Sequence, residues 1–434
     1  MKFIKHMPFV HMEVTPECNH NCIHCYNYWR KSGECEKFKF DQERSMEIAR
    51  RVIAAKPYAV VITGGEPLLV FDKLKPVIKL FKDSGIQVSI NTNAVLLNED
   101  VLNFAKEYKL RFFVSFPSGD SETCDFITNR KGSLERILKS LDVLKENNMV
   151  FNLNIVASRI NLNHIFESAK YVIQRYNLPR IYITRVGKPI NSDSSFDQYL
   201  LDTEDIKRLQ DICVAIHKEF GVDVDTGCPF PTCSFYSQEA YDLFGNRKVC
   251  TAGKSSYAVD SYGNVKACPR DSKIYGNIFA DDLVSLFELM GEWRDYSLLP
   301  DECKDCEHRY VCQGGCRVDS VPFTGKMNEM DTCANKGNLP LRYKDNKAEK
   351  EPCHYEMSDR FSFNSNSKIV QEEWGVRVDT NRTYTYLMKD FINWIMGVKT
   401  FTMEEFVAYI SPESITEVYY IIDRLLSNGV IVKL

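Results

Sequence analysis

Short runs of β-branched and aromatic residues alternate with amphipathic segments over residues 9–219 of this 434-residue chain. Each run precedes a segment with apolar residues at helical spacing, such as Ile48, Ala49 and Val52. The runs that predict strands are Phe9–Val14, Tyr58–Ile62, Ile86–Asn91, Arg111–Phe116, Phe151–Ala157 and Arg180–Arg185. Strands that alternate with helices predict an α/β fold with a parallel sheet, and six such units predict a partial (β/α)6 barrel. Chemistry in such barrels belongs at the carboxyl ends of the strands.

The segment from Cys228 to Cys353 follows a different pattern, because it is rich in Cys, Gly and Pro and has little periodicity. We therefore expect no conventional apolar core there and metal clusters in its place. Residues 335–352 are polar and contain Pro, which is typical of a linker or surface loop.

The C-terminal residues predict a small winged-helix (α+β) domain. Paired strands are predicted around Trp374-Gly375, within residues 367–379. Three helices, over 386–396, 403–410 and 414–428, and a last strand over 430–434 follow. These changes of pattern divide the chain into a barrel domain (1–222), a Cys-rich domain (223–353) and the C-terminal domain (354–434).

Composition excludes several classes of protein. The 55 Lys and Arg against 59 Asp and Glu give a net charge of −4, without the basic excess that draws proteins to nucleic acids or acidic membranes. No apolar run approaches the roughly 20 residues of a membrane helix, and no run of signal-peptide length precedes Glu13. We expect a cytoplasmic protein that binds neither nucleic acid nor membrane.

The cysteines carry the candidate chemistry. A chain with 16 Cys in a reducing compartment is more typical of metal or iron–sulfur sites than of disulfides. Cys18, Cys22 and Cys25 form a tight cluster directly after the first predicted strand. Three thiolates on one loop can hold three irons of a 4Fe-4S cube and leave the fourth iron open. The alternatives are a zinc knuckle that uses His20 or His24, or buried free cysteines.

This motif, together with Gly64-Gly65-Glu66 after the second strand, resembles the radical S-adenosylmethionine (radical SAM) superfamily. The resemblance implies that the amino and carboxylate groups of S-adenosylmethionine chelate the open iron. It also implies that Gly64, Gly65 and Glu66 contact the amino group of the cofactor. Glycines allow close backbone approach, and a carboxylate can accept from an ammonium.

Weaker matches to the same family follow the next strands. Asn93 precedes Ala94, where the family has Gly. Ser115 matches a serine near the ribose and carboxylate of the cofactor, although Pro117 replaces the family's Asp. Arg130 resembles an arginine that binds the cofactor carboxylate. The alternative for Ser115 and Arg130 is a satisfied loop residue.

The second half of the chain resembles the SPASM extension, which binds two auxiliary 4Fe-4S clusters. The spacing that carries this resemblance is that of Cys250, Gly263, Cys268, Cys303, Cys306, Cys312, Cys316 and Cys333. The family's interleaved ligation implies an outer cluster on Cys303, Cys306, Cys312 and Cys333. It implies an inner cluster on Cys250, Cys268 and Cys316.

The inner cluster lacks an obvious fourth ligand, because the nearest preceding cysteines are Cys233 and Cys228. Either Cys233 is the fourth ligand or the iron is open to substrate. A zinc ribbon on Cys303 and Cys306 is the alternative for the outer set. We interpret the remaining cysteines as structural thiols: Cys35, Cys124, Cys213 and Cys353.

The resemblance implies an enzyme with three 4Fe-4S clusters that cleaves S-adenosylmethionine to a 5'-deoxyadenosyl radical, with no catalytic residue assigned beyond the cluster. An electron enters from a reductase with flavodoxin or ferredoxin, and the auxiliary clusters let an electron leave. The C-terminal domain resembles the precursor-peptide recognition domain of peptide maturases, which binds a leader peptide as an added strand. The alternatives are a plain winged-helix module and a DNA-binding one, and the acidic residues of its last two predicted helices disfavour DNA binding. We expect oxidative modification, such as cross-linking, of a ribosomally synthesised precursor peptide. The alternatives are a sulfatase-maturing (formylglycine-generating) enzyme and a non-enzymatic iron–sulfur carrier or regulator.

Overall fold

The computed structural model describes most of the chain, in two compact units that comprise residues 7–342 and 343–434. The described residues are 9–27, 38–57, 59–245, 250–306, 308–335, 356–364, 368–372, 375–379, 384–387, 389–410, 422, 425–426 and 430–434.

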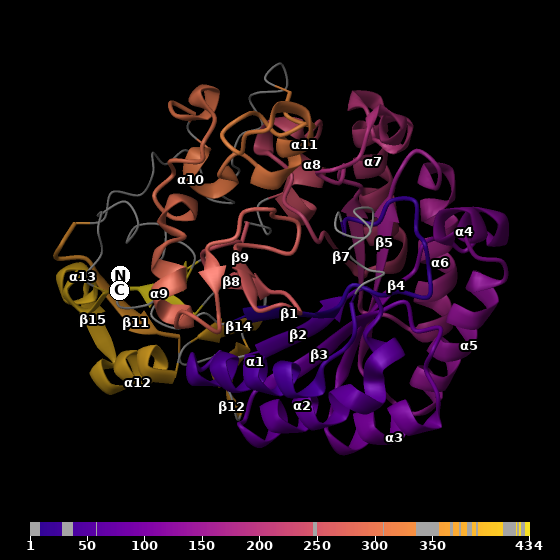
Figure 1. The fold of residues 1–434 in the computed structure, drawn as a ribbon. Helices are drawn as coiled ribbons and strands as arrows, with labels where there is room; N and C mark the ends of the chain where they lie inside the picture. Colours follow the sequence, from indigo (N-terminus) through magenta and orange to yellow (C-terminus); the bar gives the residue numbers. More distant parts are fainter. Residues whose placement is uncertain are drawn as a thin grey trace. The chain divides into compact units, whose positions relative to one another are not determined.

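The first unit is built on a ten-stranded sheet with the order β10-β9-β8-β1-β2-β3-β4-β5-β6-β7 (Figure 1). Its strands are β1 (Phe9–Thr15), β2 (Ala59–Gly64), β3 (Gln87–Thr92), β4 (Arg111–Ser115), β5 (Phe151–Ala157), β6 (Arg180–Arg185), β7 (Asp223–Asp225), β8 (Ser256–Val259), β9 (Asn264–Lys266) and β10 (Gly276–Asn277). Strands β1 to β7 are parallel, so the α/β prediction and its six strands are confirmed.

Helices cover the outer face of this curved sheet, as Figure 1 shows for α1 to α6. The longer helices are α1 (Gln42–Ala54), α2 (Phe71–Asp83), α3 (Glu99–Glu107), α4 (Ser121–Thr128), α5 (Ser133–Glu146), α6 (Ile165–Tyr176) and α7 (Thr203–Phe220). In α1 the Asp41 side chain caps the first turn by accepting from the Arg44 amide. Ile48, Ala49 and Val52 of α1 are buried, as their spacing predicts.

The Cys-rich segment contains an apolar core, so the expectation that it would lack one was wrong for residues 256–293. Strand β8 pairs in parallel with β1, and β9 and β10 extend the sheet in antiparallel fashion. Tyr257, Val259 and Trp293 are buried. Strands of two to four residues are too short to show a period in the sequence, which is why the pattern missed them. The short helix α8 (Gln238–Ala240) precedes these strands, and three short helices follow them: α9 (Leu283–Glu288), α10 (Arg309–Cys312) and α11 (Val321–Thr324).

The second unit is α+β and has a core of its own, which includes the buried Phe361, Phe401 and Phe406. Its elements are β11 (Arg360–Phe363), β12 (Lys368–Glu372), β13 (Gly375–Asp379), β14 (Tyr384–Leu387), α12 (Lys389–Val398), β15 (Thr400–Thr402), α13 (Met403–Ile410) and β16 (Ile431–Lys433). They form two three-stranded antiparallel sheets, β15-β11-β16 and β12-β13-β14.

Several C-terminal predictions can be compared with these elements. The hairpin around Gly375, the helix over 403–410 and the final strand are present. The predicted helix over 386–396 begins later, at Lys389, because Tyr384–Leu387 pairs with β13 as a strand. Most of the predicted helix over 414–428 lies outside the described residues. The winged-helix topology therefore stays a prediction.

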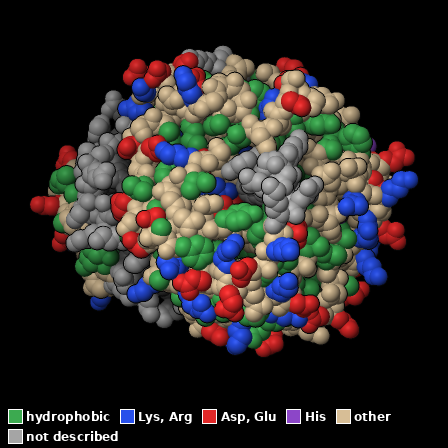
Figure 2. All heavy atoms as spheres, in the orientation of Figure 1, with side chains coloured by type: hydrophobic (Ala, Val, Ile, Leu, Met, Phe, Trp, Pro, Cys, Tyr) green, Lys and Arg blue, Asp and Glu red, His purple; other side chains and the backbone are tan. Residues whose placement is uncertain are grey.

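The surface agrees with the composition. Figure 2 shows basic side chains intermixed with acidic ones on one face of the molecule. In the part of the chain that the structure describes, every helix is too short or too polar to cross a membrane.

Candidate functional site

The loop after β1 carries Cys18, Cys22 and Cys25, all partly buried. The end of α4 holds this loop, since the Asn21 amide donates to the Thr128 carbonyl at 3.1 Å. The three thiols therefore lie on one anchored loop at the carboxyl end of the sheet.

Gly64 and Gly65 bring the end of β2 directly against this loop. The Gly65 amide donates to the Thr15 carbonyl at 2.5 Å, and the Glu66 amide donates to the Glu17 carbonyl at 2.7 Å. A Cβ on Gly65 would overlap the Glu17 carbonyl, and Gly64 has a φ of +125°. Only glycine fits both positions, so these residues seat the cysteine loop.

The carboxylate of Glu66 is buried and joins β2 to β3. It accepts from the Thr92 hydroxyl at 2.7 Å, the Asn93 amide at 2.8 Å and the Leu68 amide at 3.0 Å. Burial raises the pKa of Glu66, and these donors oppose that effect. Besides the predicted contact with the cofactor, Glu66 thus has a structural role that the sequence did not reveal.

Asn93 connects β3 to the cysteine loop. Its amide nitrogen Nδ2 donates to Oδ1 of Asn19 at 2.7 Å and lies 3.9 Å from Sγ of Cys18. The next residue, Ala94, is buried with a φ of +60°, a conformation that favours glycine. This backbone geometry explains why the related family has Gly there.

Ser115 and Arg130 are exposed, in contrast to Glu66 and Asn93. Ser115 ends β4 and pairs with Asn154 of β5. Arg130 lies just beyond α4, which holds the cysteine loop, and its carbonyl accepts from the Ser133 hydroxyl at 2.9 Å. The role of both residues in cofactor binding stays a prediction.

His24 lies between Cys22 and Cys25 in the sequence, and burial lowers the pKa of its imidazole to about 4. The ring is neutral at neutral pH, and its buried Nδ1 has no hydrogen-bond partner among the described residues. Within those residues, no three His, Cys, Asp or Glu side chains are arranged around a single metal ion. A 4Fe-4S cube distributes its ligands over separate irons, so it needs them around a larger space.

A cysteine whose role could not be predicted from the sequence, Cys228, lies beside Cys316 of the predicted inner set. The thiol of Cys228 forms a hydrogen bond with that of Cys316. Arg270 Nη1 lies 3.6 Å from Sγ of Cys316 and 4.0 Å from Sγ of Cys228. The Cys316 thiol and Arg270 lower the pKa of Cys228 to about 6 despite its burial, which favours a thiolate at neutral pH. Burial raises the pKa of Cys268, the next cysteine before Arg270.

Three cysteines of the predicted outer set, Cys303, Cys306 and Cys312, lie near one another. The amide of Cys306 donates to the Cys303 carbonyl at 3.2 Å, and the amide of Thr232 donates to Sγ of Cys312 at 3.2 Å. Burial raises the pKa of Cys233 to about 11, and the neighbouring Cys312 and Cys303 contribute. The structure thus places Cys233 beside the outer set.

Cys333 is fixed by a carboxylate, since its amide donates to Oδ1 of Asp331 at 3.0 Å and its thiol lies 3.1 Å from the same oxygen. Among the structural thiols, Cys124 and Cys213 are buried, which raises the pKa of each to about 12. Cys35 and Cys353 lie outside the described residues.

A buried ion network connects the cysteine-rich segment to the end of β6. Arg185 Nη1 lies 2.6 Å from Oδ2 of Asp319, and its Nη2 lies 2.6 Å from Oδ2 of Asp331. Arg270 Nη2 lies 3.0 Å from the other oxygen of Asp319. The Cys316 amide donates to Asp331 at 2.8 Å. This network could not be predicted from the sequence, because Asp319 and Asp331 lie 134 and 146 residues from Arg185.

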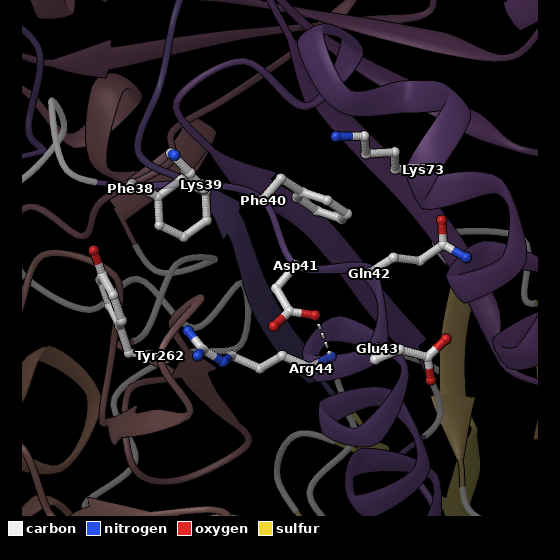
Figure 3. A pocket seen from close by; sticks show the side chains of 9 residues that line it. All are labelled: Phe38, Lys39, Phe40, Asp41, Gln42, Glu43, Arg44, Lys73 and Tyr262. Carbon is white, nitrogen blue, oxygen red and sulfur yellow. Dashed lines mark hydrogen bonds between the residues drawn. The ribbon is translucent and has the colours of Figure 1, made fainter.

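A polar surface cavity of 650 Å³ lies beside the start of α1 (Figure 3). Phe38 meets Tyr262 edge to face across it, with ring centroids 5.7 Å apart. Lys73 of α2 also lines it, but none of the predicted site residues does. We assign this cavity no function.

Comparison with known proteins agrees with the geometry of the cysteine loop. Residues 12–172 match the model of the radical SAM superfamily. The chain contains a radical SAM domain. It is therefore an enzyme of the radical SAM type, and the family implies a 4Fe-4S cluster and S-adenosylmethionine. The residues fit that cofactor, since three thiols share one loop that Gly64 and Gly65 seat against β2.

Relatives extend the similarity beyond this domain. The chain is 25% identical over 332 residues to an AdoMet-dependent heme synthase of Methanosarcina barkeri, covering 72% of this chain and 92% of that protein. It is 26% identical over 322 residues to the mycofactocin maturase MftC of Mycolicibacterium smegmatis, covering 72% and 78%. The crystal structure of Streptococcus suis SuiB bound to the precursor peptide SuiA shares the fold, with a TM-score of 0.60, 17% identity and 77% coverage of each chain.

Proposed function

We propose that this radical SAM enzyme is a peptide maturase that oxidatively modifies, by cross-linking, a residue of a ribosomally synthesised precursor peptide. The observation that supports the proposal is that the cysteine loop after β1, with Cys18, Cys22 and Cys25, and the Cys-rich segment occur together in one compact unit. SuiB, which shares this fold, has been solved with a precursor peptide.

In this proposal Cys18, Cys22 and Cys25 hold the first 4Fe-4S cluster, and Glu66 and Asn93 face S-adenosylmethionine beside it. With its cofactor bound, the cluster supplies a 5'-deoxyadenosyl radical that removes a hydrogen atom from the substrate. The protein's own residues position the cluster and the cofactor. Gly64 and Gly65 fix the loop, while Ser115 and Arg130 contribute further polar contacts to the cofactor from the ends of β4 and α4.

The Cys-rich segment would hold two auxiliary 4Fe-4S clusters, for a total of three. Removal of hydrogen leaves a substrate radical, and formation of an oxidised product requires that one further electron leaves. Auxiliary clusters held by these cysteines would offer an exit for that electron, and a flavodoxin or ferredoxin with its reductase would supply the electron that starts the reaction. The boundaries 1–222, 223–353 and 354–434 describe this division of roles.

The C-terminal unit would bind the leader of the precursor peptide. In the described residues β12 and β14 each pair only with β13, so each offers an edge to which an extended peptide can add as a strand. The unit has its own apolar core, and it carries no cluster ligand of the proposed sets. Its contribution is therefore to peptide affinity rather than to radical formation.

A sulfatase-maturing activity has less support. In that group an Asp that serves as a base commonly follows the second cysteine of the SPASM start, whereas Pro269 and Arg270 follow Cys268 here. Arg270 is directed at Cys316 and Asp319, so it does not replace that base. A non-enzymatic carrier does not agree with the match of residues 12–172 to the radical SAM superfamily.

The test is turnover of a precursor peptide. The anaerobically reconstituted full-length enzyme is incubated with dithionite, S-adenosylmethionine and the peptide encoded by a short reading frame beside its gene. We expect 5'-deoxyadenosine and a peptide that has lost hydrogen, located by tandem mass spectrometry. Conversion of Cys to formylglycine in a sulfatase peptide, or oxidation of a porphyrin with no reaction of the precursor, would contradict the proposal.

A further inference from the structure

We infer that Cys228 is the fourth protein ligand of the inner auxiliary cluster, together with Cys250, Cys268 and Cys316. This inference rests on the proposed function, in which the Cys-rich segment binds auxiliary clusters. Four cysteines close the cluster, since a 4Fe-4S cube has four irons and each thiolate occupies one. A closed cluster transfers electrons and does not bind the substrate.

The position of Cys228 is set by the barrel. It follows β7, and its carbonyl accepts from the Thr226 hydroxyl at 2.9 Å. The Gly227 amide donates to the Thr184 hydroxyl at 2.9 Å, and a Cβ on Gly227 would lie 2.7 Å from that oxygen. The backbone at Gly227 therefore packs closely against the end of β6. This packing places the Cys228 thiol beside the thiol of Cys316.

Three of the four cysteines share a neighbour. The guanidinium of Arg270 lies within 4.0 Å of the sulfurs of Cys228 and Cys316, and Arg270 is two residues from Cys268. Cys250 interacts electrostatically with Cys268. The four cysteines therefore lie around one region, in which the Arg270 guanidinium faces the sulfurs of Cys228 and Cys316.

Cys233, the alternative ligand, belongs elsewhere. It lies in a short 3-10 turn, Thr232–Ser234, whose first amide donates to Sγ of Cys312 at 3.2 Å. Its cysteine neighbours are Cys303 and Cys312 of the outer set. Cys228 and Cys233, which are five positions apart, thus lie beside different sets of cysteines, Cys228 beside Cys316 and Cys233 beside Cys303 and Cys312.

Arg270 is a positioning residue in this arrangement, and it also favours the reduced cluster. It is partly buried, with 16% of its side chain exposed, it is held by Asp319 at 3.0 Å, and it lies so close to Gly187 that a Cβ there would overlap its guanidinium. Donation to sulfur by a fixed cation stabilises the additional negative charge of the reduced cluster. This raises the reduction potential and suits a cluster that accepts an electron.

The first experiment compares Cys228→Ala with Cys233→Ala in the anaerobically reconstituted full chain. We expect about twelve irons in the wild type, for three cubes of four irons. Cys228→Ala should lose about four of these irons, or retain a cluster with one distinct iron in the Mössbauer spectrum. It should still cleave S-adenosylmethionine. Cys233→Ala should leave the inner cluster intact. The reverse pattern, or a Cys228→Ala protein with unchanged iron and spectrum, would overturn the inference.

A second experiment tests the geometry in the metal-free full-length protein and does not depend on the variant folding. Diamide accepts two electrons and two protons from a pair of adjacent thiols, which then form one S–S bond. We expect peptide mapping to find Cys228 linked to Cys316. A link from Cys316 to Cys233 instead would contradict the proposed ligand set. If this link forms but the wild type binds only about four irons, the proposed auxiliary clusters fail while the proximity of the two thiols stands.

A third measurement addresses Arg270. Arg270→Gln should keep the full iron content and lower the reduction potential of one auxiliary cluster in an EPR-monitored titration, whereas Arg270→Lys should restore part of the shift. An unchanged reduction potential in Arg270→Gln would contradict the proposal that Arg270 raises the reduction potential of the cluster.

Discussion

Replacement of Arg185 by Met should uncouple the end of β6 from the Cys-rich segment. Arg185 is buried, with 4% of its side chain exposed, and it pairs with Asp319 and Asp331, which are 3% and 0% exposed. Removal of one partner from a buried ion pair costs about 3–5 kcal/mol, because it leaves an uncompensated buried charge. At about 1.4 kcal/mol per decade, this raises local opening by roughly two to nearly four orders of magnitude.

Hydrogen exchange of the metal-free protein measures this opening directly. Peptides over residues 180–186 and 316–333 should exchange faster in Arg185→Met, by the factor just given. Arg159→Met is the matched control, because Arg159 also pairs with two carboxylates, Asp202 and Asp205, but has 41% of its side chain exposed. Its loss should cost less than about 1 kcal/mol. Equal effects of the two variants, or unchanged exchange in Arg185→Met, would refute the argument.

The pH dependence provides an independent check. Burial opposes ionisation of Asp319, but Arg185 and Arg270 outweigh burial and hold its pKa well below the usual range. A lowered pKa stabilises the folded state above the unfolded pKa of about 3.9, and this stabilisation is lost as the pH falls through the folded pKa. Without Arg185 the pKa of Asp319 rises and the carboxylate can take up a proton. The penalty of Arg185→Met should therefore be smaller at pH 5.5 than at pH 8.

Three further predictions concern the active unit and the peptide. Replacing Cys18, Cys22 and Cys25 by Ala should remove about a third of the iron, one cube of three, and all S-adenosylmethionine cleavage. Retained cleavage would rule out this cluster. Glu66→Ala should weaken S-adenosylmethionine binding by about 1.5–3 kcal/mol, or roughly ten- to over a hundredfold in a titration, whereas unchanged affinity would limit Glu66 to its structural role. Deletion of residues 360–434 should leave cofactor cleavage intact but greatly reduce modification of the precursor peptide, and full turnover by the truncated enzyme would exclude leader binding there.

The sequence was sufficient to predict six of the parallel strands. The six strands β1 to β6 are long enough to show their pattern, and each is followed by an amphipathic helix. Strands β7 to β10 were missed because two to four residues carry no period. The pairing of Glu13 with Lys266, both 2% exposed, joins residues 253 apart in sequence and could not be predicted.

The residues of the candidate site also fall into local motifs, which could be predicted, and contacts between distant residues, which could not. The motifs of the cysteine loop and of Gly64-Gly65 are local, so the sequence could predict them, and the structure brings them into contact through the Gly65 amide. The relation between Cys228 and Cys316 depends on a tight turn over Gly227, and that relation becomes visible only in three dimensions. Contacts between residues that are far apart in the sequence produce no motif of fixed spacing, so they could not be predicted.

The ion network explains why the barrel and the Cys-rich segment form one unit. Arg185 and Arg270 supply two positive charges, and Asp319 and Asp331 supply two negative ones, so the buried network is neutral before any cluster binds. Desolvation makes such a network costly unless each charge keeps its partner, and one of its four members lies on the barrel strand β6. The segment cannot leave the barrel without exposing or unpairing Arg185. The proposed boundary at residue 222 therefore lies within a single compact unit, and the barrel strand β6 helps to position Cys228 and Cys316.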